Sequence, residues 1–292
     1  MYTDRGAKLR LLVSMSIFGT IGIFKKYIQM PSSVIAMSRG LIGMLFLLVF
    51  ILFFKRRKIS SSSVKKNFLL LLISGVLIGV NWILLFEAYR YTTVSTATLC
   101  YYMAPVFVML FSPLIFKEKF TFKKAMCALG ATIGMCIISG IFGDASSSPL
   151  GIICGLSAAI LYASVVIINK FITDIADEEK TLIQLGAAGV SLVPYVLLTE
   201  SLFSISADAT SVILLVIVGV IHTGFAYTLY FGSINKLKVQ TAAMFSYIDP
   251  VVALILSALI LKEEFTLMHL IGSILILGAA FISEMPSKKD LK

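Results

Sequence analysis

Charged side chains are scarce in this sequence. Asp, Glu, Lys and Arg together make up 14% of the 292 residues, whereas a soluble domain carries about a quarter. Hydrophobic residues make up 59% of the chain, and the mean hydropathy is +0.98. A chain of this composition has too little polar surface to cover itself in water, so we expect it to reside in a lipid bilayer.

Several kinds of chemical site are also missing. The sequence has no phosphate-binding loop of the form GxxxxGK(S/T), which argues against ATP hydrolysis by this chain. It has two histidines, far apart, and no acidic pair at helical spacing within an apolar run, which disfavours an integral membrane enzyme, the alternative from a different class. All four cysteines lie in apolar runs without disulfide or metal spacing. We therefore predict no enzyme activity, no cofactor and no metal site.

Positive charge is in excess, with a formal net charge of +10. The Lys and Arg residues form short clusters between apolar runs, which is the pattern that sets membrane topology rather than one that binds nucleic acid. If the N-terminus is inside, the outside keeps only Lys25, Lys26, Arg39, Arg90 and Lys262. We predict a multi-pass protein of the cytoplasmic membrane, with both termini cytoplasmic and no nucleic-acid partner.

Ten apolar runs are long enough to cross a bilayer, which takes about 20 residues of helix. They are Leu9–Ile28, Ser33–Phe54, Phe68–Tyr89, Val94–Phe116, Phe122–Ile141, Leu150–Phe171, Leu182–Leu198, Ser211–Phe231, Val239–Leu261 and Leu267–Ser283. The predicted fold class is therefore an all-α integral membrane protein with ten transmembrane helices.

The two halves of the chain repeat each other. Tyr102–Val106 returns as Tyr247–Val251, and the same shift matches further identical residues, among them Phe86 with Phe231, Val94 with Val239 and Thr96 with Thr241. We predict two five-helix units, residues 1–145 and 146–292, joined near Asp144–Pro149. Because each unit has an odd number of helices, the units insert upside down relative to each other, as in alternating-access transporters.

These features resemble the drug/metabolite transporter superfamily, in particular its ten-helix EamA branch. The resemblance covers essentially the whole chain and is carried by Ala88–Thr92, Arg39, the matched prolines Pro105 and Pro250, and the matched helix-end acids Glu118 and Glu263. It implies a 5+5 inverted repeat, a central cavity, and export or exchange of small metabolites. It is nearly silent on the substrate.

Asp249 is the sharpest site candidate, because it stands near the middle of its apolar run, directly before Pro250. Ionisable groups in the bilayer are costly and usually functional. Asp249 is predicted to bind a substrate ammonium or to take up a proton; the alternatives are a cap on opened backbone and a pair with a buried cation. His222 is a candidate partner in a proton relay with Asp249, and its other interpretation is a packing residue.

Arg39 and Glu87 are both expected in the outer third of their helices. A buried ion pair between them, serving as a structural tie or outer gate, is the favoured interpretation, because each charge alone would be uncompensated. Direct contact with the substrate is the alternative.

Polar aromatic and amide side chains supply the remaining binding candidates, Tyr102, Tyr247, Trp82 and Asn81. Tyr102 and Tyr247 are matched between the repeats, and Trp82 also lies too deep for the interfacial belt. We predict that these rings line a cavity, with core packing as the alternative.

Pro105 and Pro250 are hinge candidates, because a proline inside a helix removes a backbone donor. Glu118 and Glu263 are candidates for a gate contact or a helix-end tie on opposite sides of the membrane; the alternative is a solvated charge cluster. Glycines at four-residue spacing allow close helix packing within the chain or, as an alternative, a homodimer face: Gly75/Gly79, Gly130/Gly134 and Gly151/Gly155.

The sequence thus predicts a secondary active transporter that moves a small metabolite across the cytoplasmic membrane by alternating access. Because both acids and bases occur in the membrane region, we favour an amino acid or a similar amphoteric compound, moved in the export direction, with proton coupling as an option. Export of lipophilic cations or drugs and exchange of anionic metabolites are the alternatives.

Overall fold

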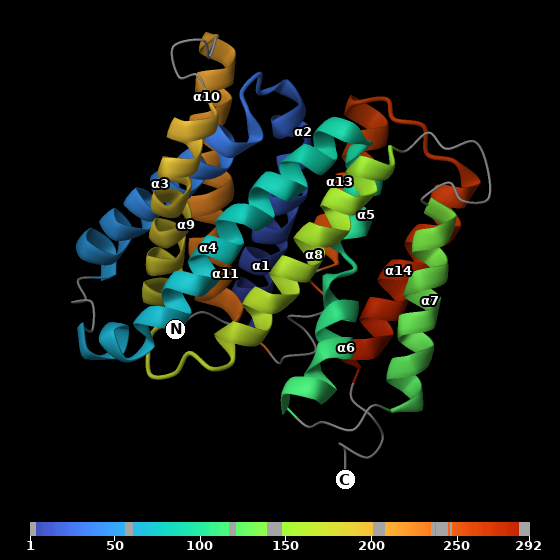
Figure 1. The fold of residues 1–292 in the computed structure, drawn as a ribbon, viewed down its shortest axis with the longest axis horizontal. Helices are drawn as coiled ribbons and strands as arrows, with labels where there is room; N and C mark the ends of the chain where they lie inside the picture. Colours follow the sequence, from blue (N-terminus) through green and yellow to red (C-terminus); the bar gives the residue numbers. More distant parts are fainter. Residues whose placement is uncertain are drawn as a thin grey trace.

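A computed structural model describes residues 4–55, 61–116, 121–138, 148–200, 208–234, 237, 245 and 247–285. In chain order its helices are α1 (Asp4–Gly19), α2 (Ile21–Tyr27), α3 (Ser32–Val49), η1 (Phe50–Lys55), α4 (Ser61–Tyr91), α5 (Val94–Tyr101), α6 (Ala104–Phe116), α7 (Phe122–Ile138), α8 (Pro149–Asn169), α9 (Asp177–Thr199), α10 (Ala209–Ile217), η3 (Val218–Phe225), α11 (Ala226–Ile234), α13 (Ile248–Ile260) and α14 (Leu267–Glu284). They lie side by side in one bundle, and α1 begins on the side where α14 ends (Figure 1).

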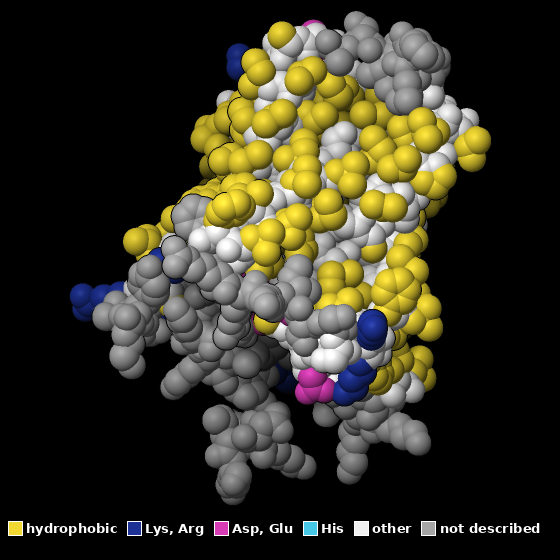
Figure 2. All heavy atoms as spheres, turned by 90° about the vertical axis from the view of Figure 1, so that its left-hand side faces the viewer, with side chains coloured by type: hydrophobic (Ala, Val, Ile, Leu, Met, Phe, Trp, Pro, Cys, Tyr) yellow, Lys and Arg dark blue, Asp and Glu magenta, His cyan; other side chains and the backbone are white. Residues whose placement is uncertain are grey.

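The bundle has the dimensions of a membrane protein. Seven of the described helical stretches are long and apolar enough to span a bilayer, and three shorter apolar helices, Ala125–Ile137, Ile248–Ile260 and Leu267–Ile282, complete the ten predicted crossings. Hydrophobic side chains cover a broad flank of the molecule, and charged side chains lie toward its two ends (Figure 2). The predicted fold class, an all-α membrane protein with ten helices, is confirmed.

The packing has the symmetry expected of two repeats. α4 packs along α8, and its counterpart in the second half, α11, packs along α1. α4 also packs on α9, and in the same way η3 of the second half packs on α3 of the first. Helices that occupy equivalent places in the two halves also pack on each other, α3 on α9 and α7 on α14. With five crossings in the first half, the second half starts on the opposite side, so the repeats are inverted. The predicted joint, Asp144–Pro149, lies mostly outside the described residues, and the boundaries 1–145 and 146–292 stay a prediction.

Glycines bring helices of the two halves into close contact. A Cβ atom on Gly75 of α4 would lie 2.5 Å from the Cβ of Ala187 on α9. Where α3 crosses α9, a Cβ on Gly40 would lie 3.0 Å from the amide nitrogen of Gly189. Further close contacts within the chain occur at Gly79, Gly134, Gly151 and Gly155. These glycines serve internal packing, and the homodimer stays untested.

Both repeats are interrupted beside their matched prolines. α5 ends at Tyr101, residues 102–103 form a turn, and α6 begins at Ala104; in the second repeat α13 begins at Ile248 after a turn at Tyr247. The prediction of a proline in mid-helix is therefore wrong. Pro105 and Pro250 each lie in the first turn of a new helix, where the missing N–H removes no hydrogen bond. Their role as hinges stays a prediction.

Substituting Gly75 with Ala should lower the melting temperature of the detergent-solubilised protein. The added Cβ would meet the Cβ of Ala187 at 2.5 Å and the carbonyl oxygen of Gln184 at 2.7 Å, and overpacking of this kind costs about 1–3 kcal/mol. Gly278→Ala in α14 is the matched control, because nothing lies within 4 Å of its added Cβ; it should be neutral or stabilise by up to about 1 kcal/mol. Equal melting temperatures would contradict the close α4–α9 packing.

Candidate substrate site

Arg39 lies in the interior of the bundle, on α3, and is only 4% exposed. Its guanidinium carbon is 4.0 Å from the centroid of the Trp82 ring and 5.7 Å from that of Phe86. Its Nε donates a hydrogen bond to Thr223 Oγ1 at 3.1 Å. Within the described residues the guanidinium makes no ion pair with a carboxylate and no further hydrogen bond. Stacking and one hydrogen bond hold this cation, and its terminal nitrogens are left available.

Thr223 is presented to Arg39 by the π-helical segment η3. Its hydroxyl donates to the carbonyl oxygen of Val218, five residues earlier, at 3.0 Å. Such widened turns are rare and often occur at functional sites, since they re-aim side chains. Sequence reasoning missed Thr223, because a threonine in an apolar run gives no signal until its partner is known.

His222 directly precedes Thr223 in the same segment and is buried. The distance between its Nε2 and Thr20 Oγ1 is 2.7 Å. Its ring centroid is 4.6 Å from that of Phe24. No contact joins His222 to Asp249 among the described residues. The predicted relay between these two side chains is therefore not formed in this structure, and the contacts of His222 are those of a packed residue.

Asp249 reaches the interior from the second repeat. It lies in the first turn of α13 and is half-buried. Tyr102, at the break in the first repeat, donates a hydrogen bond to its carboxylate. α1 passes directly behind, and a Cβ on Gly19 would lie 2.5 Å from the carbonyl oxygen of Asp249. In the part of the chain that the structure describes, no Lys or Arg pairs with Asp249, so the buried-cation alternative finds no support there.

Arg39 and Asp249 lie near the same tyrosines. Tyr89, Tyr101 and Tyr227 each interact electrostatically with both charges. One charge comes from each repeat, and the same hydroxyl-bearing rings are near both. We call Arg39, Asp249, Tyr89, Tyr101 and Tyr227 the central cluster.

The other aromatic and amide candidates support this cluster or lie apart from it. Asn81 donates to the carbonyl oxygen of Ala158 at 2.5 Å and accepts a long hydrogen bond of 3.5 Å from the Tyr101 hydroxyl, which ties Tyr101 to α8. Trp82 forms the face on which Arg39 stacks. Tyr247 lies with its ring 5.7 Å from Phe281 of α14. The structure thus brings Asn81, Trp82 and Tyr102 to the cluster and places Tyr247 against α14.

The predicted ion pair between Arg39 and Glu87 is wrong. Glu87 lies 3.7 Å from Arg90, one turn further along α4, and no contact joins it to Arg39. The two side chains leave their helices in different directions. The prediction rested on the depth of each residue in the membrane, and depth does not determine this direction. Glu87 instead lines a pocket.

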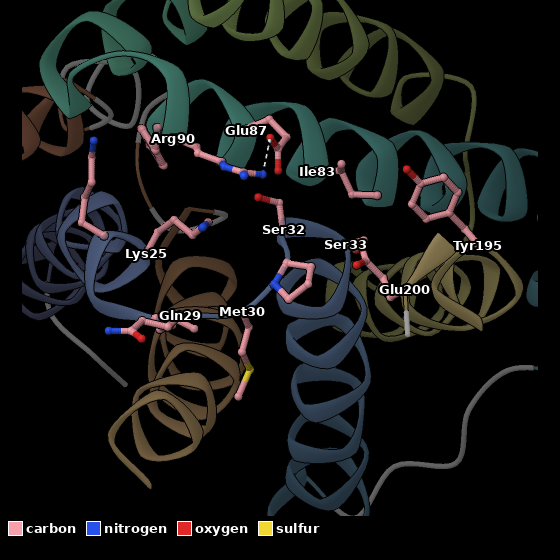
Figure 3. Close-up of a pocket in the computed structure, with 14 residues that line it drawn as sticks. Lys25, Gln29, Met30, Ser32, Ser33, Ile83, Glu87, Arg90, Tyr195 and Glu200 are labelled. Atoms are coloured by element: carbon pink, nitrogen blue, oxygen red, sulfur yellow. Dashed lines mark hydrogen bonds and ion pairs between the residues drawn. The ribbon is translucent and has the colours of Figure 1, made fainter. Parts of the chain in front are cut away.

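This pocket has a volume of about 690 Å³ and opens where the ends of α2, α3, α4 and α9 meet (Figure 3). Its polar lining includes Lys25, Ser32, Ser33, Glu87, Arg90 and Glu200. Tyr89 also lines it and is a member of the central cluster, so the pocket and the cluster share this residue. We call it the Lys25 pocket.

The opposite end of α4 is tied to the connection between α8 and α9. Lys66 lies 2.6 Å from the carboxylate of Asp174, and Asn67 Nδ2 donates to the carbonyl oxygen of Thr173 at 2.8 Å. The Lys66 ammonium holds the pKa of the exposed Asp174 carboxyl below its usual range, which is the expected effect of a neighbouring cation. These contacts join the two repeats at the end of the bundle that lies away from the Lys25 pocket.

Glu263 makes the contacts of a helix-end tie. Its carboxylate accepts hydrogen bonds from the backbone N–H of Val94 at 2.7 Å and from the N–H and hydroxyl of Ser95, both at 3.1 Å. The second repeat thereby caps α5 of the first with an acid, which the helix dipole favours. The matched Glu118 lies outside the described residues.

Comparisons with known proteins agree with this architecture. The model of the EamA-like transporter family matches residues 7–140 and 149–285. The chain is 30% identical to the Bacillus subtilis protein called uncharacterized transporter YxxF, over 92% of this chain and 86% of that protein. It is 25% identical to uncharacterized transporter YoaV of the same species, over 73% of this chain and 74% of that protein.

A protein of known crystal structure has the same fold. Its TM-score is 0.68 at 16% sequence identity, and the match covers 97% of both chains. At this identity the likeness supports the fold alone.

Replacing Glu263 with Ala should destabilise the protein by about 1–2 kcal/mol, because two N–H groups of α5 lose their cap. The melting temperature in detergent is the measurement. Glu264→Ala is the matched control, since the neighbouring acid is exposed and makes none of these contacts. Glu263→Gln should fall between the two. A Glu263→Ala variant as stable as Glu264→Ala would show that the tie contributes nothing.

Proposed function

Because the chain belongs to the EamA-like transporter family and is a membrane transporter, not an enzyme, we propose that its substrate is a small amphoteric metabolite such as an amino acid. One observation carries this proposal. Arg39 and Asp249 come from opposite repeats, lack partners of opposite charge among the described residues, and share Tyr89, Tyr101 and Tyr227 as neighbours. A substrate with a carboxylate and an ammonium matches both.

The energetics favour a charged occupant. Removing one ion from water costs several kcal/mol. Stacking on Trp82 returns about 2 kcal/mol when desolvated, and the Thr223 hydrogen bond returns a similar amount. The dipole at the start of α13 stabilises an ionised Asp249 by about 0.3–1 kcal/mol. These contributions leave both charges partly uncompensated, and a zwitterion would supply the missing partner to each.

The shape of the described state fits one half of an alternating-access cycle. The Lys25 pocket opens at one end, while the Lys66–Asp174 and Asn67–Thr173 contacts join the repeats at the other. Inverted repeats that rock about a central site exchange these two arrangements. The distribution of Lys and Arg supports cytoplasmic termini, with the Lys25 pocket on the outside. Activity of a C-terminally fused reporter that works only outside the cytoplasm would contradict this orientation.

Export coupled to proton entry is the direction and mechanism we propose. Asp249 is half-buried beside a helix break and accepts a hydrogen bond from Tyr102. A carboxyl in this position can hold either the substrate ammonium or a proton, and exclusive occupancy by one or the other would couple the two movements in opposite directions.

Fluorescence of Trp82 should report substrate binding, since it is the only tryptophan and lies under Arg39. Zwitterionic amino acids should change the emission saturably. Arg39→Gln and Asp249→Asn should each raise the Kd at least about tenfold, or about 1.4 kcal/mol. Because Arg39→Gln alters the reporter itself, a radiolabelled substrate should be measured in parallel. Lys65→Gln and Glu264→Gln remove exposed charges outside the cluster and serve as matched controls.

Two results would redirect this assignment. Binding of tetraphenylphosphonium that depends on Asp249 but not on Arg39 would favour the export of lipophilic cations. Binding of anions alone, dependent on Arg39, would favour anion exchange. Amino acids that bind the wild type and both variants equally well would contradict the amphoteric site.

Asp249→Asn should uncouple transport from the pH gradient, since an amide cannot take up the proton. In proteoliposomes, at substrate concentrations that saturate the variant, substrate exchange should persist while accumulation driven by a pH gradient is lost. Glu264→Gln should keep both activities. Full pH-driven accumulation by Asp249→Asn would exclude this residue as the coupling carboxyl.

A further inference from the structure

The N-terminus of α3 opens into the Lys25 pocket without a side-chain cap. Pro31 occupies the cap position and has no side-chain acceptor, and no other side chain caps the helix there. The first N–H groups of a helix have no acceptor within the helix, and their dipole favours an anion. This helix runs for 18 residues, so the full effect of the dipole is present at its start.

Ser32, in the first turn of α3, supplies an independent sign of a missing ligand. It lines the Lys25 pocket and is 3% exposed, yet its hydroxyl has no hydrogen-bond partner. A buried hydroxyl without a partner costs about 1–3 kcal/mol. Figure 3 shows Ser32 extending from α3 toward the space that Lys25 and Arg90 also face.

Lys25 is the third component. It is 9% exposed, and its ammonium makes no hydrogen bond or close ion pair with any described residue, although Glu87 attracts it from a distance. The other charges of the pocket have partners: Arg90 lies 3.7 Å from Glu87, Lys26 donates to the carbonyl oxygen of Thr92, and Glu200 accepts from the Ser33 hydroxyl. One cation is therefore left over, beside an uncapped helix and an unpartnered hydroxyl.

We propose that the Lys25 pocket contains a carboxylate-binding subsite formed by Lys25, the Ser32 hydroxyl and the N-terminus of α3. A singly charged oxyanion suits the site better than a phosphate dianion, since Glu87 and Glu200 line the same pocket. Tyr89 lines this pocket and also lies near Arg39, so a metabolite would dock here by its carboxylate before Arg39 takes it over. The docking role, unlike the carboxylate site itself, rests on the proposed function.

Acetate is the probe for the subsite, and its effect on the melting temperature of the full-length protein in neutral detergent, at constant ionic strength, is the measurement. Acetate should stabilise the wild type saturably. Lys25→Met should raise the apparent Kd at least about tenfold, and Ser32→Ala roughly threefold to tenfold, as expected for one lost hydrogen bond. Lys65→Met and Ser191→Ala are the matched controls, because Lys65 is exposed near the other end of α4 and the Ser191 hydroxyl is satisfied within α9.

Further arms separate this subsite from other sources of stabilisation. An acetate effect lost in Arg39→Gln but kept in Lys25→Met would place the anion in the central cluster and overturn the proposal. Equal stabilisation of all variants would overturn it as well, and so would inorganic phosphate binding more tightly than acetate. If Lys25→Met does not purify as a folded protein, Lys25→Arg replaces it and should retain acetate binding, whereas Lys25→Gln should not.

The docking role has its own readout. With the transported metabolite, Lys25→Met should raise KM severalfold and leave the maximal rate unchanged, since the subsite acts before the transport step. Unchanged KM together with lost acetate binding would keep the carboxylate site and remove it from the path. Failure of amino acids to bind the central cluster would defeat the proposed function, while the acetate result would stand by itself.

Discussion

Hydrocarbon offers no hydrogen-bonding partner to a peptide group, so the two interrupted helices exist only where protein surrounds them. The turn at residues 102–103 and the start of α13 at Ile248 meet this requirement, because α13 packs on both α5 and α1. Gly19 lets α1 approach the carbonyl oxygen of Asp249 without a side chain in between. The same interruptions bring Tyr102 and Asp249 together. The bilayer restricts such backbone breaks to the protein interior, and there they also supply polar side chains.

Burial of Arg39 illustrates how a cation is held without a carboxylate. A planar guanidinium can stack on Trp82 and Phe86 while one nitrogen donates to Thr223, and this arrangement leaves its remaining nitrogens available. An ion pair with Glu87 would have stabilised Arg39 more strongly, but it would have left the guanidinium unable to bind a substrate carboxylate. Lys25 is a second cation of this kind. Each neighbouring charge of the pocket has a hydrogen-bond or ion-pair partner, and the Lys25 ammonium has neither among the described residues.

Hydropathy was sufficient to predict the ten crossings, since a spanning helix is a property of a continuous stretch and survives errors of a few residues at its ends. The family was predicted from its resemblance to this sequence at the matched motifs of the two halves. Neither hydropathy nor the motifs could predict which way a side chain points from its helix. Arg39 and Glu87 lie on helices that pack together, yet Arg39 extends to Trp82 and Glu87 lies beside Arg90. For the same reason Thr223 and Ser32 gave no signal in the sequence; their roles arise from a π-helical turn and an uncapped helix end.

The two repeats differ at the positions that matter most for the proposed site. Ala104 occupies the place that Asp249 takes in the second copy, and each lies directly before a matched proline. α3 carries the glycine pair Gly40/Gly43, and α9 carries the equivalent pair Gly186/Gly189 where the two helices cross. The residue before the first glycine of each pair is Arg39 in the first copy and Leu185 in the second. In the proposed transport cycle, the residues shared by the two repeats build a frame that takes up two inverted arrangements, while each repeat contributes one charge that the other lacks. For the proposed zwitterionic substrate, positive at one end and negative at the other, these two charges would set one preferred orientation in an otherwise symmetric frame, whichever end of the bundle is open.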